Sequence, residues 1–201
     1  MSKLFCIMGK SASGKDTIFK HLVRDESLGL KTIVSYTTRP MREGEKDGEE
    51  YYFVSRETLE AFSARGQVIE CRNYRTIHGV WSYFMVNDGQ IDFSGEKDSV
   101  IIGTLESYMQ IRNYFGEAHV VPIYIEVEDG LRLSRALERE RQQARPKYAE
   151  LCRRFLADTE DFSGERLKAC GIHQIYENID METCLNRIRT DIVKMRENVL
   201  Y

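Results

Sequence analysis

The chain has 201 residues, of which 42% are hydrophobic and 30% charged, and its formal charge is −3 at pH 7. This length suits one well-packed domain and is short for two. The slight negative charge argues against a general nucleic-acid or acidic-membrane surface, because such partners select strongly positive surfaces. No apolar run approaches the ~20 residues of a membrane-spanning helix.

The five cysteines are scattered along the chain and include no C-x-x-C pair. This spacing predicts reduced thiols rather than a disulfide framework or a zinc site. We therefore expect a cytoplasmic protein.

Strands and helices are predicted to alternate along the chain. The apolar run Leu4–Met8 predicts a buried strand, and the spacing of Ile18, Phe19, Leu22 and Val23 predicts a helix that begins at Lys15. Further strands are expected at 31–38, 51–55, 67–74, 98–104, 120–127 and 172–178, and further helices at 56–66, 131–162 with a break near Pro146, and 181–198. This order predicts an α/β three-layer domain with a mainly parallel central sheet. Short strands from about 37 to 83 indicate a small appended subdomain.

The first motif is the stretch GKSASGKDT at residues 9–17, which lies between the first strand and the first helix. Gly9, Gly14 and Lys15 have the spacing of a phosphate-binding loop. Backbone N–H groups of such a loop surround phosphate oxygens, and its lysine reaches the outer phosphates. The predicted ATP-binding residues here are Gly9, Lys10, Ser11, Ala12, Ser13, Gly14, Lys15, Asp16 and Thr17.

Asp16 departs from this motif, which normally carries Ser or Thr at that position to hold Mg²⁺. An unbalanced carboxylate beside a triphosphate is unfavourable, so two interpretations stay open. Asp16 holds Mg²⁺, directly or through a water, with Thr17 supplying a hydroxyl, or Asp16 turns away and caps the helix N-terminus. The first interpretation makes Asp16 and Thr17 the predicted metal residues.

A second motif at residues 35–55 combines Arg39, Arg42 and Tyr51. Taken alone, this segment is typical of a charged turn. Beside a phosphate loop, it predicts a second anion site, because two guanidiniums and a phenol donate several directed hydrogen bonds to phosphate oxygens. A kinase for a nucleoside monophosphate needs such a site to hold the acceptor phosphate in line.

With this segment, the sequence resembles the guanylate kinase family, whose pattern T-T-R-x-x-R-x-G-E-x-x-G-x-x-Y-x-F-V-S matches residues 37–55. The resemblance implies transfer of the γ-phosphate of ATP to GMP, and also to dGMP, with Mg²⁺ as cofactor and ADP and the nucleoside diphosphate as products. It also implies a P-loop NTPase fold in one domain, 1–201, with a core (1–34 and 98–201), a monophosphate-binding subdomain (about 35–97) and a helical lid (about 135–155).

The resemblance also assigns roles in the acceptor site. Arg39, Arg42 and Tyr51 would hold the acceptor phosphate, and Ser35 would lie beside the base. Glu70 would accept hydrogen bonds from guanine N1–H and the exocyclic amine, a role that suits guanine and repels N1 of adenine.

The resemblance is weaker toward the C-terminus. It implies that lid arginines neutralise the transferring phosphate, and the arginines available are Arg135, Arg139, Arg141, Arg153 and Arg154. We prefer Arg139 and Arg154, which join Lys15 as the predicted catalytic residues, although a solvated helix face would carry the same charges. Asn178 occupies the place of the family asparagine near the donor adenine.

Two further segments depart from the family pattern. In HGVWSYF, His78 or Tyr83 would replace the family's phosphate-binding tyrosine, and His78 is included among the GMP-binding residues. Val80, Trp81 or Ser82 would replace a hydroxyl near guanine. The family's Asp-x-Asp pair is missing, since Gly103 and Leu105 occupy those places and Glu106 is the nearest acid.

These departures leave two other functions open: a kinase for another monophosphate or phosphorylated metabolite, and a non-catalytic binding module. The sequence does not indicate an oligomeric state.

Overall fold

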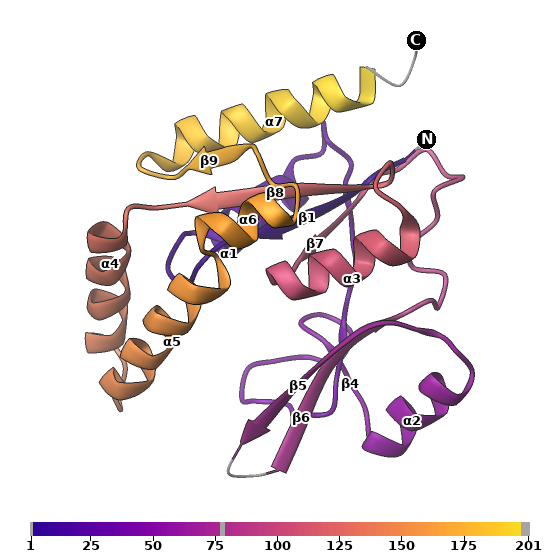
Figure 1. Cartoon of the computed structure of the whole chain (residues 1–201), viewed down its shortest axis with the longest axis horizontal. Helices are drawn as coiled ribbons and strands as arrows, with labels where there is room; N and C mark the ends of the chain where they lie inside the picture. Colours follow the sequence, from indigo (N-terminus) through magenta and orange to yellow (C-terminus); the bar gives the residue numbers. More distant parts are fainter. Residues whose placement is uncertain (1, 77–78, 198–201) are drawn as a thin grey trace.

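The computed structural model describes residues 2–76 and 79–197, which form two β-sheets with helices around them (Figure 1). The larger sheet has the strand order β2-β7-β1-β8-β9, and all neighbouring strands in it are parallel. Its strands are β1 (Leu4–Met8), β2 (Lys31–Thr32), β7 (Ser99–Ile102), β8 (Val120–Glu126) and β9 (Ile175–Glu177). The predicted α/β fold with a mainly parallel central sheet is confirmed.

The central strand β1 is buried on both faces, as its uninterrupted apolar sequence predicts. Four helices cover these faces: α1 (Lys15–Arg24), α3 (Leu105–Phe115), α6 (Gly164–Ala169) and α7 (Met181–Glu197). Because side chains alternate along a strand, Leu4, Cys6 and Met8 pack on the side of α3 and α6. Phe5 and Ile7 pack on the side of α1 and α7. The result is three layers, helices, sheet and helices.

The smaller sheet has the strand order β4-β3-β6-β5. Its elements are β3 (Tyr36–Thr37), β4 (Tyr52–Phe53), α2 (Arg56–Ala64), β5 (Val68–Thr76) and β6 (Gly79–Val86). The β5–β6 hairpin and α2 project away from the larger sheet (Figure 1). All of these elements fall between β2 and β7 in sequence, in the region where short strands are predicted.

The single strand predicted for 31–38 is wrong, because this segment divides between the two sheets. Ile33 N–H still donates to Val100 O in the larger sheet, at 3.1 Å. The ring of Tyr36 instead packs in the smaller unit, with its centroid 4.8 Å from that of Tyr52 and 5.4 Å from that of Phe84. Residues 33–35 therefore link the two sheets.

The long helical stretch predicted near the C-terminus is interrupted as expected, since α4 (Asp129–Arg141) ends before Pro146 and α5 (Tyr148–Asp161) begins after it. Three elements were not predicted, namely α3, α6 and β6. Within the described part of the chain, none of the helices combines the length and apolar character needed to cross a bilayer.

Candidate active site

The phosphate loop has the backbone that its glycines predict. Gly14 has φ of 85°, in the left-handed region that favours glycine. Gly9 lies against β8, where an added Cβ would stand 2.6 Å from the carbonyl oxygen of Ile125. Below the loop, Asn178 is 3% exposed, and its Nδ2 donates to Ser13 O at 2.8 Å. Asn178 thus contacts the loop and supports its conformation.

Lys15 and Asp16 lie side by side at the start of α1. Lys15 Nζ donates to Asp16 Oδ2 at 3.3 Å, and the two side chains are 20% and 69% exposed. Gly14 is the N-cap residue, and α1 has no side-chain capping hydrogen bond. In this arrangement the Asp16 carboxylate accompanies the lysine head group instead of capping the helix. Thr17 is also exposed.

The loop is tied to α4 and α5, the helices that contain the predicted lid, through a carboxylate that was not predicted. Ser11 N–H donates to Asp158 Oδ2 at 2.7 Å, and Asp158 also lies 3.5 Å from Nη1 of Arg132. Arg132 is 1% exposed and bonds to Asp129 at 2.9 Å, while Lys10 reaches Asp129 at 3.3 Å. One buried guanidinium therefore links both lid helices to the first residues of the loop.

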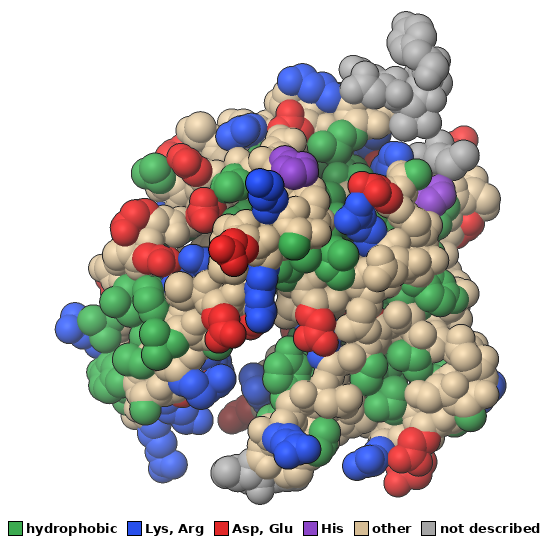
Figure 2. Space-filling view, viewed as in Figure 1, with side chains coloured by type: hydrophobic (Ala, Val, Ile, Leu, Met, Phe, Trp, Pro, Cys, Tyr) green, Lys and Arg blue, Asp and Glu red, His purple; other side chains and the backbone are tan. Residues whose placement is uncertain are grey.

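A cavity of about 770 Å³ lies between the loop, the hairpin and the lid helices. Its lining includes Ser11 of the loop, Arg42 of the predicted acceptor site, and both preferred lid arginines, Arg139 and Arg154. Figure 2 shows the molecule hollowed between the lobe of α4 and α5 and the lobe of the smaller sheet, with Lys and Arg side chains around the opening. Residues predicted from distant parts of the sequence thus face one space.

Three of the predicted lid arginines have contacts of their own. Arg135 Nη1 donates to the carbonyl oxygen of Asn178 at 3.2 Å, next to β9. Arg153 and Arg154 both bond to Glu150, at 2.7 and 2.8 Å, and both are more than half exposed. The charge of Glu150 therefore offsets these two arginines in this conformation.

Arg39 is 4% exposed and is held by several groups of the smaller unit. Its Nη1 and Nη2 donate to Glu45 at 2.7 and 2.5 Å, and its guanidinium lies over the rings of Tyr51 and Phe53, at 5.3 and 5.2 Å from their centroids. These hydrogen bonds from Arg39 hold the pKa of Glu45 at about 2. Arg42 is exposed and reaches the cavity that Arg39 does not line.

Strand β6 indicates which residues of the HGVWSYF segment face the acceptor side. The ring of Tyr83 lies 5.5 Å from that of Tyr51, and Trp81 lines the 770 Å³ cavity. Val80 and Ser82 line a groove on the opposite face of the hairpin. Of the two alternatives for the phosphate-binding tyrosine, Tyr83 lies beside Tyr51, whereas His78 lies outside the described residues.

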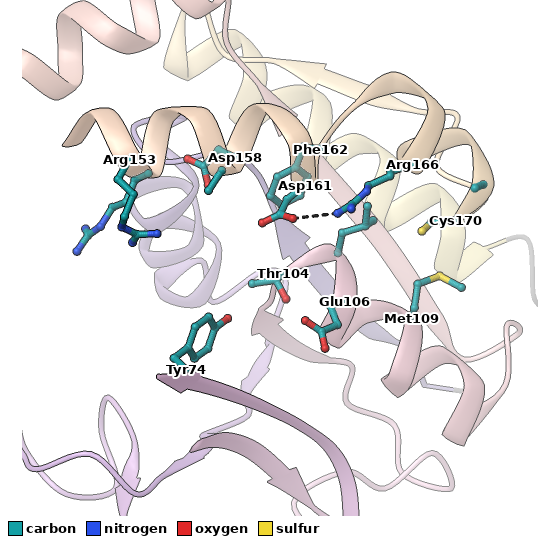
Figure 3. A pocket seen from close by; sticks show the side chains of 14 residues that line it. Tyr74, Thr104, Glu106, Met109, Arg153, Asp158, Asp161, Phe162, Arg166 and Cys170 are labelled. Atoms are coloured by element: carbon teal, nitrogen blue, oxygen red, sulfur yellow. Dashed lines mark hydrogen bonds and ion pairs between the residues drawn. The ribbon is translucent and has the colours of Figure 1, made fainter. Parts of the chain in front are cut away.

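A second cavity, of about 570 Å³, continues between β5, α3 and α5. Figure 3 shows Tyr74, Thr104 and Glu106 on one side of it and the α5 side chains Asp158 and Asp161 on the other. Near this cavity, Glu70 is 2% exposed, and burial raises its pKa even though Arg72 lies beside it and opposes the shift. The charge of Glu106 acts in the same direction as burial.

Ser35, the remaining predicted acceptor residue, lies in the link between the sheets, where its carbonyl oxygen accepts from Tyr52 N–H at 2.9 Å. The sequence interpretation missed Arg72, Arg132 and Asp158, whereas it named Tyr83 as one of two alternatives. Arg72 could have been found from its i, i+2 spacing to Glu70 on a predicted strand, which places both side chains on one face.

Comparisons with known proteins place the chain among relatives of one family. The profile of the family described as Guanylate kinase matches residues 1–154. A guanylate kinase of Rhodopseudomonas palustris is 44% identical over 70 residues, which are 35% of this chain and 31% of that protein. One of Symbiobacterium thermophilum is 48% identical over 67 residues, 33% of this chain and 31% of that protein. The matches to these curated relatives thus span about a third of their length.

The fold is similar to a crystal structure of guanylate kinase from Anaplasma phagocytophilum, with a TM-score of 0.61 and 19% identity. This similarity covers 100% of this chain and 87% of the other. At that identity, the likeness concerns the fold.

Proposed function

Because the chain belongs to the guanylate kinase family, we propose that it transfers the γ-phosphate of ATP to GMP and dGMP, which gives ADP and the nucleoside diphosphate. The observation that carries this proposal is the 770 Å³ cavity, whose lining joins the phosphate loop, Arg42, Arg139 and Arg154. A phosphoryl-transfer site needs donor phosphate, acceptor phosphate and cationic groups in one space.

In the proposed reaction, the protein positions the substrates and neutralises charge, without a covalent intermediate. The loop N–H groups and Lys15 bind the donor phosphates. Arg42, with Arg39 and Tyr51 behind it, orients the acceptor phosphate. Arg139 and Arg154 close over the transferring group. On closing, Arg154 releases Glu150 and binds the phosphate instead.

The residues at the loop fit Mg²⁺. The exposed Asp16 carboxylate and Thr17 hydroxyl are oxygen ligands of the kind that Mg²⁺ prefers. No group of three or more His, Cys, Asp or Glu that could hold a metal occurs within 2–76 and 79–197, which fits an ion bound mainly through substrate phosphates and water. When bound, Mg²⁺ supplies charge neutralisation between the donor phosphates.

The proposal divides the chain into a donor core (1–34 and 98–201), an acceptor unit (about 35–97) and a lid (about 135–155). Asn178 would lie near the donor adenine, and Ser35, Glu70 and His78 would belong to the acceptor site. We place this activity in purine nucleotide metabolism and, given the free cysteines, in the cytoplasm.

A coupled assay of ADP formation tests the proposal with ATP, Mg²⁺ and a panel of GMP, dGMP, AMP, CMP and UMP. We expect turnover of GMP and dGMP and poor use of AMP. Lys15→Ala, purified identically, excludes a contaminating kinase. No turnover of any monophosphate would refute the proposed function, and equal turnover of GMP and AMP would refute the guanine assignment.

A further inference from the structure

Glu70 and Arg72 form a closed ion pair on β5. The two residues are two positions apart, so their side chains share the strand face of Tyr74. Arg72 Nε donates to Glu70 Oε2 at 2.9 Å, and Arg72 Nη2 donates to Glu70 Oε1 at 3.1 Å. The side chain of Arg72 is 13% exposed and that of Glu70 is 1% exposed. One edge of the guanidinium therefore occupies both oxygens of the carboxylate that the family resemblance assigns to guanine.

This pair lies between the two parts of the acceptor site. Burial opposes the shift, but Glu70 and then the phenols of Tyr74 and Tyr51 raise the pKa of Arg72. Burial and, after it, the charge of Glu106 raise the pKa of Glu70. Tyr51 contacts Arg39 in the predicted acceptor-phosphate site, whereas Tyr74 and Glu106 line the 570 Å³ cavity. An acceptor base attached to a phosphate at Arg39 and Arg42 would therefore meet the ion pair.

The remaining hydrogen-bonding groups of the pair have a defined pattern. Arg72 has five N–H donors, and only Nε and Nη2 make hydrogen bonds among the described residues. The end of the guanidinium formed by Nη1 and Nη2 therefore keeps two parallel donors. Next to them, Oε1 of Glu70 keeps a lone pair. The order presented along this edge is donor, donor, acceptor.

That order complements a 6-oxopurine. Guanine and hypoxanthine present N7 and O6 as acceptors and then N1–H as a donor, whereas adenine presents N7 as an acceptor, N6 as a donor and N1 as an acceptor. Two of the three positions in adenine are mismatched. Bidentate donation by arginine to O6 and N7 is also the commonest specific contact made to guanine in DNA.

Resting on the proposed function, we propose that Arg72 reads O6 and N7 of the acceptor base while Glu70 Oε1 accepts from N1–H. The acceptor class is then the 6-oxopurine nucleoside monophosphates, which include the hypoxanthine nucleotide IMP as well as GMP. The 2-amino group of guanine contributes little, because a two-point contact with N1–H and the amine needs the bidentate face of the carboxylate, which Arg72 already occupies through Nε and Nη2.

Arg72→Lys is the informative substitution, since lysine keeps the charge beside the buried Glu70 but lacks the planar pair of donors. Its matched control is Arg75→Lys. Arg75 lies on the same strand but lines the groove on the opposite face of the hairpin. Both proteins are first compared with the wild type by thermal unfolding, so that a loss of fold is recognised.

The assay measures kcat/KM with GMP, IMP and AMP, and dissociation constants for GMP and IMP by titration calorimetry. We expect the wild type to use IMP within about tenfold of GMP and to use AMP about 100-fold less well. Arg72→Lys should lose about 10- to 100-fold in affinity for both GMP and IMP, while Arg75→Lys stays unchanged.

Two results would overturn the inference. One is that the folded Arg72→Lys variant binds GMP as tightly as the wild type does. Arg72 would then only pair with Glu70 and would not contact the base. The other is that the wild type binds IMP more than about 100-fold more weakly than GMP. The 2-amino group of guanine would then donate to the Glu70 carboxylate. Absence of turnover refutes the proposed function alone, since calorimetry still tests whether Arg72 reads the base.

Discussion

Replacing Asp16 by alanine removes a carboxylate on which the fold itself depends little. The side chain is 69% exposed, it forms an ion pair with Lys15 at 3.3 Å, and α1 has no side-chain capping bond among the described residues. An exposed ion pair contributes about 0–1 kcal/mol, and a carboxylate near a helix N-terminus contributes about 0.3–1 kcal/mol. We therefore expect Asp16→Ala to lower the free energy of unfolding by about 0.3–2 kcal/mol.

The same substitution should change the metal requirement strongly. If Asp16 helps to hold Mg²⁺, its loss should raise the Mg²⁺ concentration for half-maximal rate by about 10- to 100-fold and should lower kcat. Asp16→Ser restores the usual hydroxyl of the motif. It should rescue the enzyme only in part, because Gly103, just after β7, and Leu105, at the start of α3, occupy the places of the acidic pair that would compensate.

The assay is an Mg²⁺ titration of the coupled reaction at saturating ATP and GMP, with urea unfolding measured on the same samples. Glu26→Ala is the control, since it also removes an exposed carboxylate, which lies beyond the other end of α1. An unchanged Mg²⁺ midpoint in Asp16→Ala, combined with a lower unfolding midpoint, would refute the metal role and leave Asp16 as a residue that stabilises the helix.

Three other predictions follow from the contacts described. Lys15→Ala should lower kcat far more than it weakens GMP binding, because its charge meets the transferring phosphate; equal losses in kcat and in the calorimetric affinity would contradict this role. Asp158→Asn should lower the free energy of unfolding by about 1–3 kcal/mol, measured in urea, because Ser11 N–H and the buried Arg132 lose a charged partner; an unchanged midpoint would argue against it. Hydrogen bonds from Arg39 lower the pKa of Glu45 from 4.5 to about 2, so this pair stabilises the fold fully above pH 4.5, and the stabilisation is lost as pH falls toward 2. The free energy of unfolding of Glu45→Gln, measured in urea, should therefore fall less than that of the wild type when the pH is lowered from about 5 to 3. Parallel plots of this free energy against pH for the two proteins would contradict the assignment.

The sequence predicted those elements in which the spacing of apolar residues reflects one constant pattern of burial along the element. The run Leu4–Met8 is apolar throughout because β1 is covered on both faces, and the stripe of Ile18 and Leu22 reports one covered face of α1. The segment 31–38 misled because it changes sheets after Ile33 without any change in composition. Helix α3 carries Leu105, Tyr108 and Ile111 at three-residue spacing, but a short amphipathic run after a strand gives a weak signal.

The candidate site was predicted where a motif fixes spacing and missed where contacts join distant residues. Glycines and Lys15 of the loop follow from backbone requirements that are local in sequence. Asp158 reaches Ser11 across 147 positions, so its pattern in the sequence is only that of a charged helix face. Arg72 was not singled out, since its pairing with Glu70 depends on the shared strand face and on burial.

The antiparallel pairing of Tyr36 with Phe84 brings together the first and last parts of the smaller sheet. The chain therefore enters and leaves this unit at neighbouring points, which is the geometry that tolerates insertion or exchange of a whole segment. In an ancestral gene, such an insert can be replaced or can accumulate substitutions without altering β1, the phosphate loop or α1. Acceptor choice can then diverge rapidly among descendants while the chemistry of the phosphate donor is inherited unchanged.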